Sequence, residues 1–145
     1  MAQSPRVVVD TNVLVAGLRS RRGASFRLLS EVGKGRFEMA LSVPLVLEYE
    51  DALLRLRHSD VTRLNQGDVD ALLDYFCSVA HLQQIFYLWR PILPDPKDDL
   101  LLELAVAARC QSIVTFNRRD FAGVDKFGVS VVEPGPFLSG LGVFQ

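Results

Sequence analysis

The sequence lacks the features of a membrane, secreted or disulfide-bonded protein. No apolar run in its 145 residues reaches the ~20 residues that a helix needs to cross a bilayer. The N-terminus lacks the basic-then-apolar layout of a signal peptide. Cys77 and Cys110 have no second thiol at metal-ligand spacing, so we expect free thiols in a reducing compartment. These absences predict a cytoplasmic protein with no membrane association.

A dominant charge is also missing. The chain carries 16 Lys and Arg against 17 Asp and Glu, a net charge of -1. Such a balance gives no general attraction to nucleic acid, so any binding of that kind needs a local basic patch. His58 and His81 each stand without a nearby Cys or His, and we expect both to be incidental. The length and the absence of linkers or repeats predict one domain over residues 1–145.

Apolar and helical segments alternate along the chain. Pro5 bounds a run of valines at residues 7–9, which is typical of a strand buried on both faces in a parallel sheet. The alternation predicts an α/β fold. The expected strands are residues 6–9, 37–41, 111–115 and 129–132. The expected helices are residues 25–33, 45–56, 68–80 and 96–108, and residues 134–137 are expected to end the last strand before a short tail.

Polar side chains follow two of the predicted strands. Asp10 comes directly after the first strand, and Thr115, Asn117 and Asp120 stand at the end of the third. In open parallel sheets the ligand crevice lies beyond the carboxyl ends of the strands, so both groups are placed for chemistry. Asp10 has a simpler interpretation as a helix cap. The repeated placement favours a shared site over capping alone.

Two expected helices contribute further carboxylates. Glu48 lies early in the helix at residues 45–56, and Asp95 is expected to cap the helix that follows it. Capping does not explain why both Asp98 and Asp99 come next, because adjacent carboxylates repel each other unless a cation is near. Carboxylates gathered in one crevice favour Mg²⁺ or Mn²⁺, and a metal ion that polarises phosphate and activates water suits phosphodiester hydrolysis.

These segments together resemble the PIN-domain proteins, whose nuclease domain occurs in many toxins of bacterial and archaeal toxin-antitoxin pairs. The resemblance covers nearly the whole chain, and the order and spacing of its motifs are specific. It implies a three-layer α/β/α sandwich around a mainly parallel sheet, and metal-dependent cleavage of single-stranded RNA. The motifs are Val-Val-Asp10-Thr11-Asn12-Val13-Leu14, Leu41-Ser42 followed by Glu48-Tyr49-Glu50, Asp95-Pro96-Lys97-Asp98-Asp99 followed by Leu104-Ala105, and Ile113-Val114-Thr115-Phe116-Asn117-Arg118-Arg119-Asp120-Phe121.

The resemblance also implies roles for single residues. Asp10 and Glu48 match the first and second acids of the family. The third acid is open, because counting back from Thr115 favours Asp99, whereas the Asp-Pro-x-Asp pattern favours Asp98, which we prefer. The expected catalytic set is Asp10, Glu48, Asp98 and Asp120, and the expected metal ligands are Asp10, Asp98, Asp99 and Asp120.

The fourth acidic position departs from the family pattern. Asn117 stands two residues after the strand threonine, where the family often has Asp, and Asp120 is expected to take over. An amide adds no charge, so binding of a second metal ion is left open. Asn12, Thr115 and Asn117 match supporting positions, of which Asn12 and Thr115 would orient the acids through hydrogen bonds.

Binding partners are expected on similar grounds. Arg22, Arg118 and Arg119 lie close in sequence to the acidic motifs and are candidates for contacts with RNA phosphates. The resemblance implies a small antitoxin protein as a possible partner. It also implies a homodimer, for which the apolar residues of the helix at 68–80 and the Phe-rich C-terminus leave room.

Two alternatives belong to other classes of protein. One is a catalytically weakened PIN-like module that binds RNA or acts as a scaffold, which Asn117 would explain. The other is a phosphatase or receiver-like phosphoryl-transfer domain. Phosphatases of the haloacid dehalogenase type need a second Asp where this chain has Asn12, and Lys126 fits poorly as a receiver lysine.

Overall fold

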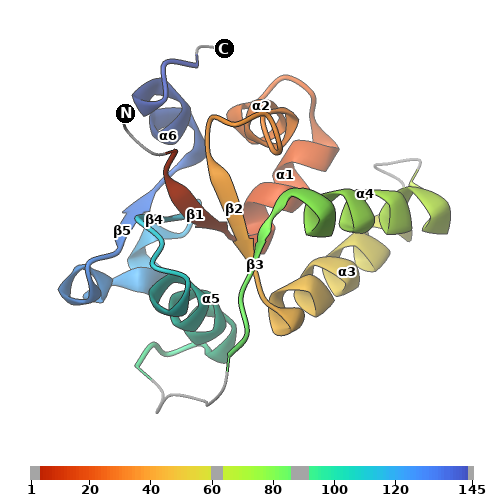
Figure 1. Cartoon of the computed structure of the whole chain (residues 1–145). Coiled ribbons are helices and arrows are strands. Elements are labelled where there is room, and N and C mark those ends of the chain that lie inside the picture. Colours follow the sequence, from red (N-terminus) through yellow and green to blue (C-terminus); the bar gives the residue numbers. More distant parts are fainter. Residues whose placement is uncertain (1–3, 60–63, 86–91, 144–145) are drawn as a thin grey trace.

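A computed structural model describes residues 4–59, 64–85 and 92–143 of the chain. Its centre is a five-stranded sheet with the order β3-β2-β1-β4-β5, in which every neighbouring pair is parallel (Figure 1). This confirms the predicted α/β fold with a parallel sheet. The strands are β1 (Arg6–Val9), β2 (Glu38–Leu41), β3 (His81–Leu82), β4 (Ser112–Val114) and β5 (Ser130–Val132).

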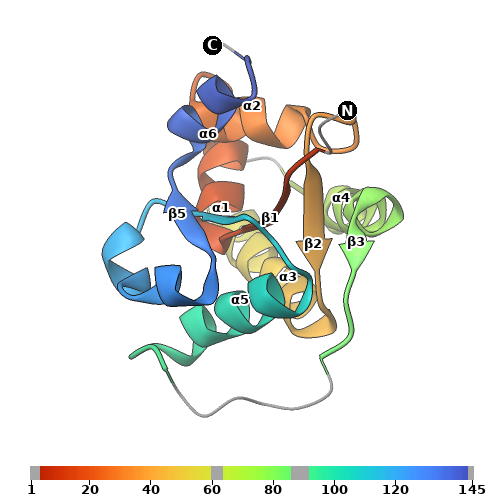
Figure 2. The same cartoon turned by 60° about the vertical axis from the view of Figure 1, so that its left-hand side comes forward.

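Helices cover both faces of the sheet and complete an α/β/α sandwich. Helix α5 lies on one face against β1, β2 and β4 (Figure 2). Right-handed connections place α1 and its neighbour α2 on the opposite face. The helices are α1 (Thr11–Arg19), α2 (Ala24–Ser30), α3 (Val43–Arg57), α4 (Gln66–Val79), α5 (Pro96–Ala107) and α6 (Pro134–Gly140), with short 3₁₀ turns η1 (Arg118–Phe121) and η2 (Val124–Phe127).

Strand β1 is the middle of the sheet, as its run of valines requires. Val7, Val8 and Val9 are completely buried. Their side chains point to alternate faces of the sheet, and helices cover both faces. In the register with β4, Val9 is the partner of Val114. The two central strands therefore end side by side, and whatever follows them enters the same space.

Local capping fixes where the next helices begin. The Ser42 hydroxyl accepts a hydrogen bond from the Leu45 N–H at the start of α3. The Asp95 carboxylate accepts one from the Lys97 N–H at the start of α5, with Pro96 in the first turn, as the sequence predicts. The first turn of α5 carries Asp98 and Asp99, whereas Glu48 lies in the second turn of α3.

Three elements, besides the 3₁₀ turns, were not among the expected strands and helices. Helix α1, which begins at Thr11, was considered only through the interpretation of Asp10 as a helix cap. Strand β3 has only two residues, His81 and Leu82, at the edge of the sheet, which is too short to show an alternating pattern. The expected tail after residue 134 was wrong, since α6 begins at Pro134. Proline is compatible with the first turn of a helix, where its missing N–H has no partner to lose.

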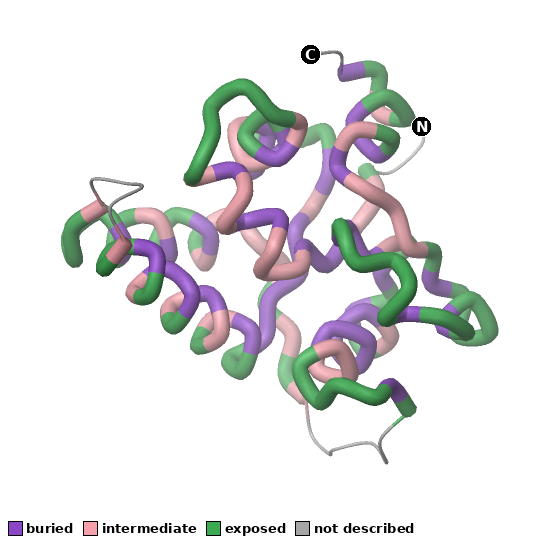
Figure 3. The backbone as a smooth tube through the Cα atoms, turned by 180° about the vertical axis from the view of Figure 1, so that it is seen from behind, coloured by how far each residue is buried: buried purple, intermediate pink, exposed green. Residues whose placement is uncertain are grey.

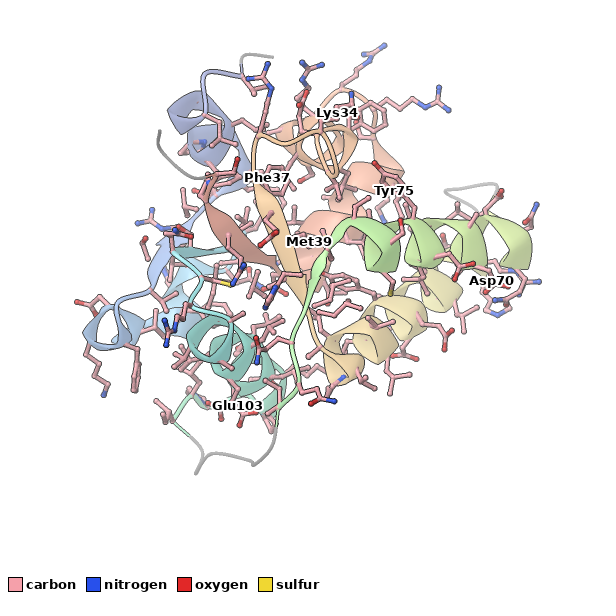
Figure 4. All side chains as sticks on the ribbon, viewed as in Figure 1. Lys34, Phe37, Met39, Asp70, Tyr75 and Glu103 are labelled. Carbon is pink, nitrogen blue, oxygen red and sulfur yellow. The ribbon has the colours of Figure 1, made fainter. Side chains whose placement is uncertain are left out.

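The apolar residues that were expected to leave room for a homodimer are largely used within the monomer. Leu73 and Phe76 of α4 are buried, and Phe137 of α6 packs edge-on against Phe37 with ring centroids 5.4 Å apart. Figure 3 shows the buried residues through the centre of the fold, and Figure 4 labels Phe37 beside β2. Homodimerisation stays a prediction, and these buried residues do not provide a surface for it. Within the described ranges, no helix is long and apolar enough to cross a membrane.

Candidate functional site

The site lies where the winding of the sheet changes direction. From β1 the chain adds β2 and β3 on one side, and β4 and β5 are added on the other. The crevice between the carboxyl ends of β1 and β4 is therefore the topological switch point, the usual ligand position in such sheets. Asp10 and Thr115 are the first residues after these two strands. The Asp10 N–H donates to the Val114 carbonyl over 2.9 Å and fixes the two strand ends together.

Thr115 is the hub of a hydrogen-bond network at this point. Its side chain is completely buried, and its hydroxyl donates to Oδ2 of Asp10 over 2.8 Å. The same oxygen accepts from Nδ2 of Asn12 over 3.3 Å and from the backbone N–H of Asn117 over 3.0 Å. With both acceptor positions used, the hydroxyl proton is directed at the carboxylate. Asp10 stands at the N-cap position of α1 but makes no capping hydrogen bond with its side chain, which instead accepts the hydrogen bond from Thr115.

A cavity of about 200 Å³ gathers the predicted catalytic acids. They arrive from four different segments: Asp10 after β1, Glu48 from α3, Asp98 from the first turn of α5, and Asp120 from η1. Asn12 and Asn117 also line this cavity, which we call the acidic cavity. Its remaining lining residues are Thr11, Leu45, Arg55, Asp95, Lys97, Leu100 and Leu101.

The carboxylates of the acidic cavity disturb one another. Burial raises the pKa of Asp10, an effect that the Thr115 hydroxyl and the N–H groups of the next two residues partly offset and that the charge of Asp120 increases. Burial also raises the pKa of Asp98 to about 6, together with the negative charges of Asp10, Asp95, Asp120 and Asp99. Negative charge therefore accumulates here without full compensation from the protein.

This donor set fits a hard divalent cation by its chemistry. Within the described part of the chain, no three His, Cys, Asp or Glu side chains are drawn together closely enough to form a complete metal site. Mg²⁺ does not need such a cage, because it keeps several waters and takes only one or two carboxylates together with substrate phosphate. Oxygen donors whose charges repel one another, set in an open cavity, suit that mode of binding.

Glu48 is positioned from two sides. The neighbouring Tyr49 is completely buried, and its hydroxyl donates to the Val9 carbonyl, which joins α3 to the end of β1. Burial, and then the charge of Asp10, raise the pKa of Tyr49, so the phenol stays protonated as the donor. The Lys97 ammonium lies 3.6 Å from the Glu48 carboxylate and places a positive charge at the cavity wall.

The structure separates the two adjacent acids of α5. Asp98 lines the acidic cavity, whereas Asp99 does not. The Asp99 carboxylate accepts hydrogen bonds from the N–H groups of Leu93 and Ile92 over 2.9 and 3.2 Å, and so holds the segment before α5. Successive helix positions differ by 100°, so the helix start decides which acid faces the sheet.

The predicted arginines fall into two groups. Arg118 and Arg119 line a second cavity of about 560 Å³ that adjoins the acidic cavity, while Arg22 lies in the exposed turn after α1 and lines neither. Sequence reasoning passed over Lys97 and Phe116 as site residues. Both residues lie inside the acidic motifs, and this position could have identified them as candidates.

The chain is thus a parallel α/β/α sandwich with acidic side chains at its central switch point. The chain belongs to the PIN domain family, whose model matches residues 6–119. Among solved structures, it is similar in fold to a chain in the crystal structure of VapBC2 from Rickettsia felis bound to a DNA fragment from their promoter. That likeness has a TM-score of 0.59 and 15% sequence identity, and covers 88% of this chain and 99% of the other. A comparison with curated proteins gives no match.

Proposed function

We propose that the protein is a metal-dependent endoribonuclease that hydrolyses phosphodiester bonds of single-stranded RNA. The observation that carries the proposal is the convergence of Asp10, Glu48, Asp98 and Asp120 on one cavity at the switch point of the sheet. Membership of the PIN domain family supports a nuclease, and thus a hydrolase. Membership of this family also argues against the phosphatase and receiver-like alternatives.

Asp10 and Asp98 would hold the cation, Mg²⁺ or Mn²⁺, with Glu48 and Asp120 completing the acidic surroundings. Such an ion supplies charge neutralisation at phosphate oxygens and a lower pKa for attacking water. Thr115 keeps the Asp10 carboxylate in one orientation through its 2.8 Å hydrogen bond. Asp99 leaves the proposed ligand set, because its carboxylate is bonded to backbone N–H groups.

The remaining alternative is a PIN-like module with weakened chemistry. Asn117 is the reason for considering it, but Asp120 lines the same cavity and supplies a carboxylate there. The four predicted catalytic carboxylates are therefore all present in the cavity despite Asn117. This favours an active nuclease over an RNA-binding or scaffold module.

The direct test uses a labelled single-stranded RNA and the same sequence as a duplex. We expect cleavage of the single strand with Mg²⁺ or Mn²⁺, no cleavage in excess EDTA, and recovery when the cation is restored. Cleavage that continues at the same rate in EDTA would remove the metal from the proposal. A complete lack of cleavage with either cation would favour the weakened module.

We propose further that the nuclease is the toxin of a cytoplasmic toxin-antitoxin pair. Its fold is similar to a chain of VapBC2, which was crystallised with DNA from their promoter, and this supports a partner protein here as well. Expression of the wild-type chain is expected to arrest growth, and co-expression of the product of the adjacent gene is expected to restore it. Growth arrest by Asp10→Asn to the same degree would contradict the toxin proposal.

A further inference from the structure

An aromatic ring stands exposed at the edge of the acidic site. Phe116 follows the fully buried Thr115, yet 43% of its surface is accessible to solvent. Its backbone N–H donates to Oδ1 of Asn12 over 3.4 Å, which ties this position to the start of α1. Single exposed apolar side chains are normal on protein surfaces, so the significance of Phe116 lies in its position beside the acidic site.

The ring opens onto a cavity that continues into the site. This second cavity, of about 560 Å³, is lined by Phe116, Asn117, Arg118, Arg119 and Asp120. Asn117 and Asp120 also line the acidic cavity, so the two hollows meet at these side chains. A chain of nucleotides with one phosphate at the acids would place its neighbouring nucleotide beside Phe116.

The charge of this cavity suits such an occupant. Arg118 and Arg119 are exposed, and among the residues that the structure describes neither makes an ion pair or a side-chain hydrogen bond. Their guanidinium groups are thus available for phosphate oxygens, which they bind through two donors at once. An aromatic face flanked by uncommitted arginines is the combination that binds single-stranded nucleic acid, in which each base offers a π-face.

We propose that Phe116 is a stacking platform for the base next to the cleaved phosphodiester, while Arg118 or Arg119 contacts the flanking phosphate. The inference rests on the proposed function and adds a structural reason for its single-strand preference. A base in a duplex already stacks and pairs with its neighbours, so it has to leave the helix before it can cover Phe116. Stacking does not read the base edge, and the contact therefore tolerates all four bases.

The test measures binding without cleavage. A fluorescein-labelled single-stranded RNA is titrated with the protein in EDTA, and anisotropy gives the affinity. Phe116→Ala is expected to weaken binding by about 5- to 150-fold, the range for loss of one stacked base. Phe116→Trp keeps a π-face and is expected to bind at least as tightly as the wild type. Phe116→Leu keeps an apolar side chain without a ring and is expected to behave like alanine.

Phe127 provides the matched control. It is 37% exposed, lies in η2 and lines neither cavity, so Phe127→Ala is expected to leave RNA affinity unchanged. A second arm uses RNA with one abasic nucleotide, moved through the sequence. At the position that meets the ring, removal of the base should cost the wild type as much as Phe116→Ala, and the two losses should not add.

The proposal is overturned if Phe116→Ala binds like the wild type, if Phe116→Leu restores affinity, or if the wild type does not bind the single strand. A shift of Phe116→Ala from dimer to monomer with unchanged RNA affinity would show a protein contact instead. The outcome is separate from that of the cleavage assay. RNA that binds through Phe116 without being cut would support the platform and contradict the nuclease, whereas metal-dependent cleavage together with wild-type affinity of Phe116→Ala would contradict the platform alone.

Discussion

The hydroxyl of Thr115 donates a 2.8 Å hydrogen bond to Oδ2 of Asp10, and so joins the residues that follow the two central strands. The relationship connects fold to chemistry. Parallel pairing of Val9 with Val114 brings the next residues together, and the buried hydroxyl then fixes the direction of the acid. A carboxylate oriented in this way loses less freedom when it meets a cation.

Thr115→Val keeps the shape of the side chain and removes the hydroxyl. We expect RNA cleavage to fall by roughly 10-fold, the lower range for loss of a group that orients a metal ligand. The free energy of unfolding should fall by about 1–2 kcal/mol, because the Asn12 amide and the Asn117 N–H lose their acceptor. Cleavage assays and urea unfolding measure the two effects. Thr115→Ser keeps the hydroxyl and should restore cleavage, but not full stability, because it removes a buried methyl group. Wild-type activity in the valine variant would exclude an orienting role.

Asp98→Asn and Asp99→Asn should separate chemistry from structure. Asp98 lines the acidic cavity, so its replacement is expected to weaken Mn²⁺ binding by at least about 10-fold, measured by calorimetry. Asp99 holds the N–H groups of Ile92 and Leu93, so its replacement should lower stability by roughly 1 kcal/mol with little effect on the metal. The opposite pattern would make Asp99 the ligand.

The raised pKa of Asp98 predicts a pH dependence of stability in the metal-free protein. The pKa is about 6 in the folded state against 3.8 for an unperturbed carboxyl group, so between these values the folded state binds more protons. The free energy of unfolding should therefore fall as pH rises from about 4 to about 7. Because Asp98 is partly exposed, its share is roughly 1 kcal/mol.

Other carboxylates titrate in the same range, so the comparison needs Asp98→Asn. Urea unfolding in EDTA at pH 4 and pH 7.5 should show that the variant gains more stability relative to the wild type at the higher pH. An equal difference between the two proteins at both values would exclude the pKa shift. Added Mn²⁺ should stabilise the wild type at pH 7.5 and have less effect on the variant.

Arg118→Glu combined with Arg119→Glu should weaken binding of single-stranded RNA and reduce its salt dependence. Each phosphate contact that is lost lowers the slope of log affinity against log salt by about 0.7. Arg21→Glu combined with Arg22→Glu makes the same charge change outside both cavities and should have a smaller effect on the slope. An unchanged slope in the double variant would place the phosphate contacts elsewhere.

Part of this organisation could be predicted from the sequence. The valines before Asp10 and the apolar run before Thr115 require buried parallel strands, and such strands end at a common edge. The predicted strands at residues 6–9, 37–41, 111–115 and 129–132 correspond to β1, β2, β4 and β5. The sequence pattern did not predict β3, because its two residues are too few to show a pattern and form a strand by pairing with β2.

The finer arrangement of the site depends on distances that a sequence does not contain. The sequence alone does not distinguish Asp98 from Asp99. The packing of α5 on the sheet places Asp98 in the cavity and Asp99 against the preceding backbone. Phe116 lies just after a buried strand, and phenylalanine is a residue type that is usually found in the core. Its exposure results from the turn into η1, which no local propensity indicates.

The most direct test of the account compares wild type with Asp10→Asn in cleavage of single-stranded RNA at saturating Mn²⁺. The substitution preserves the size of the side chain and removes the charge at the centre of the acidic cavity. Circular dichroism and urea unfolding should show that the variant folds. We expect its cleavage rate to fall by at least about 100-fold, the upper range for the loss of a metal-site group. A folded Asp10→Asn variant that cleaves at the wild-type rate would contradict the central claim.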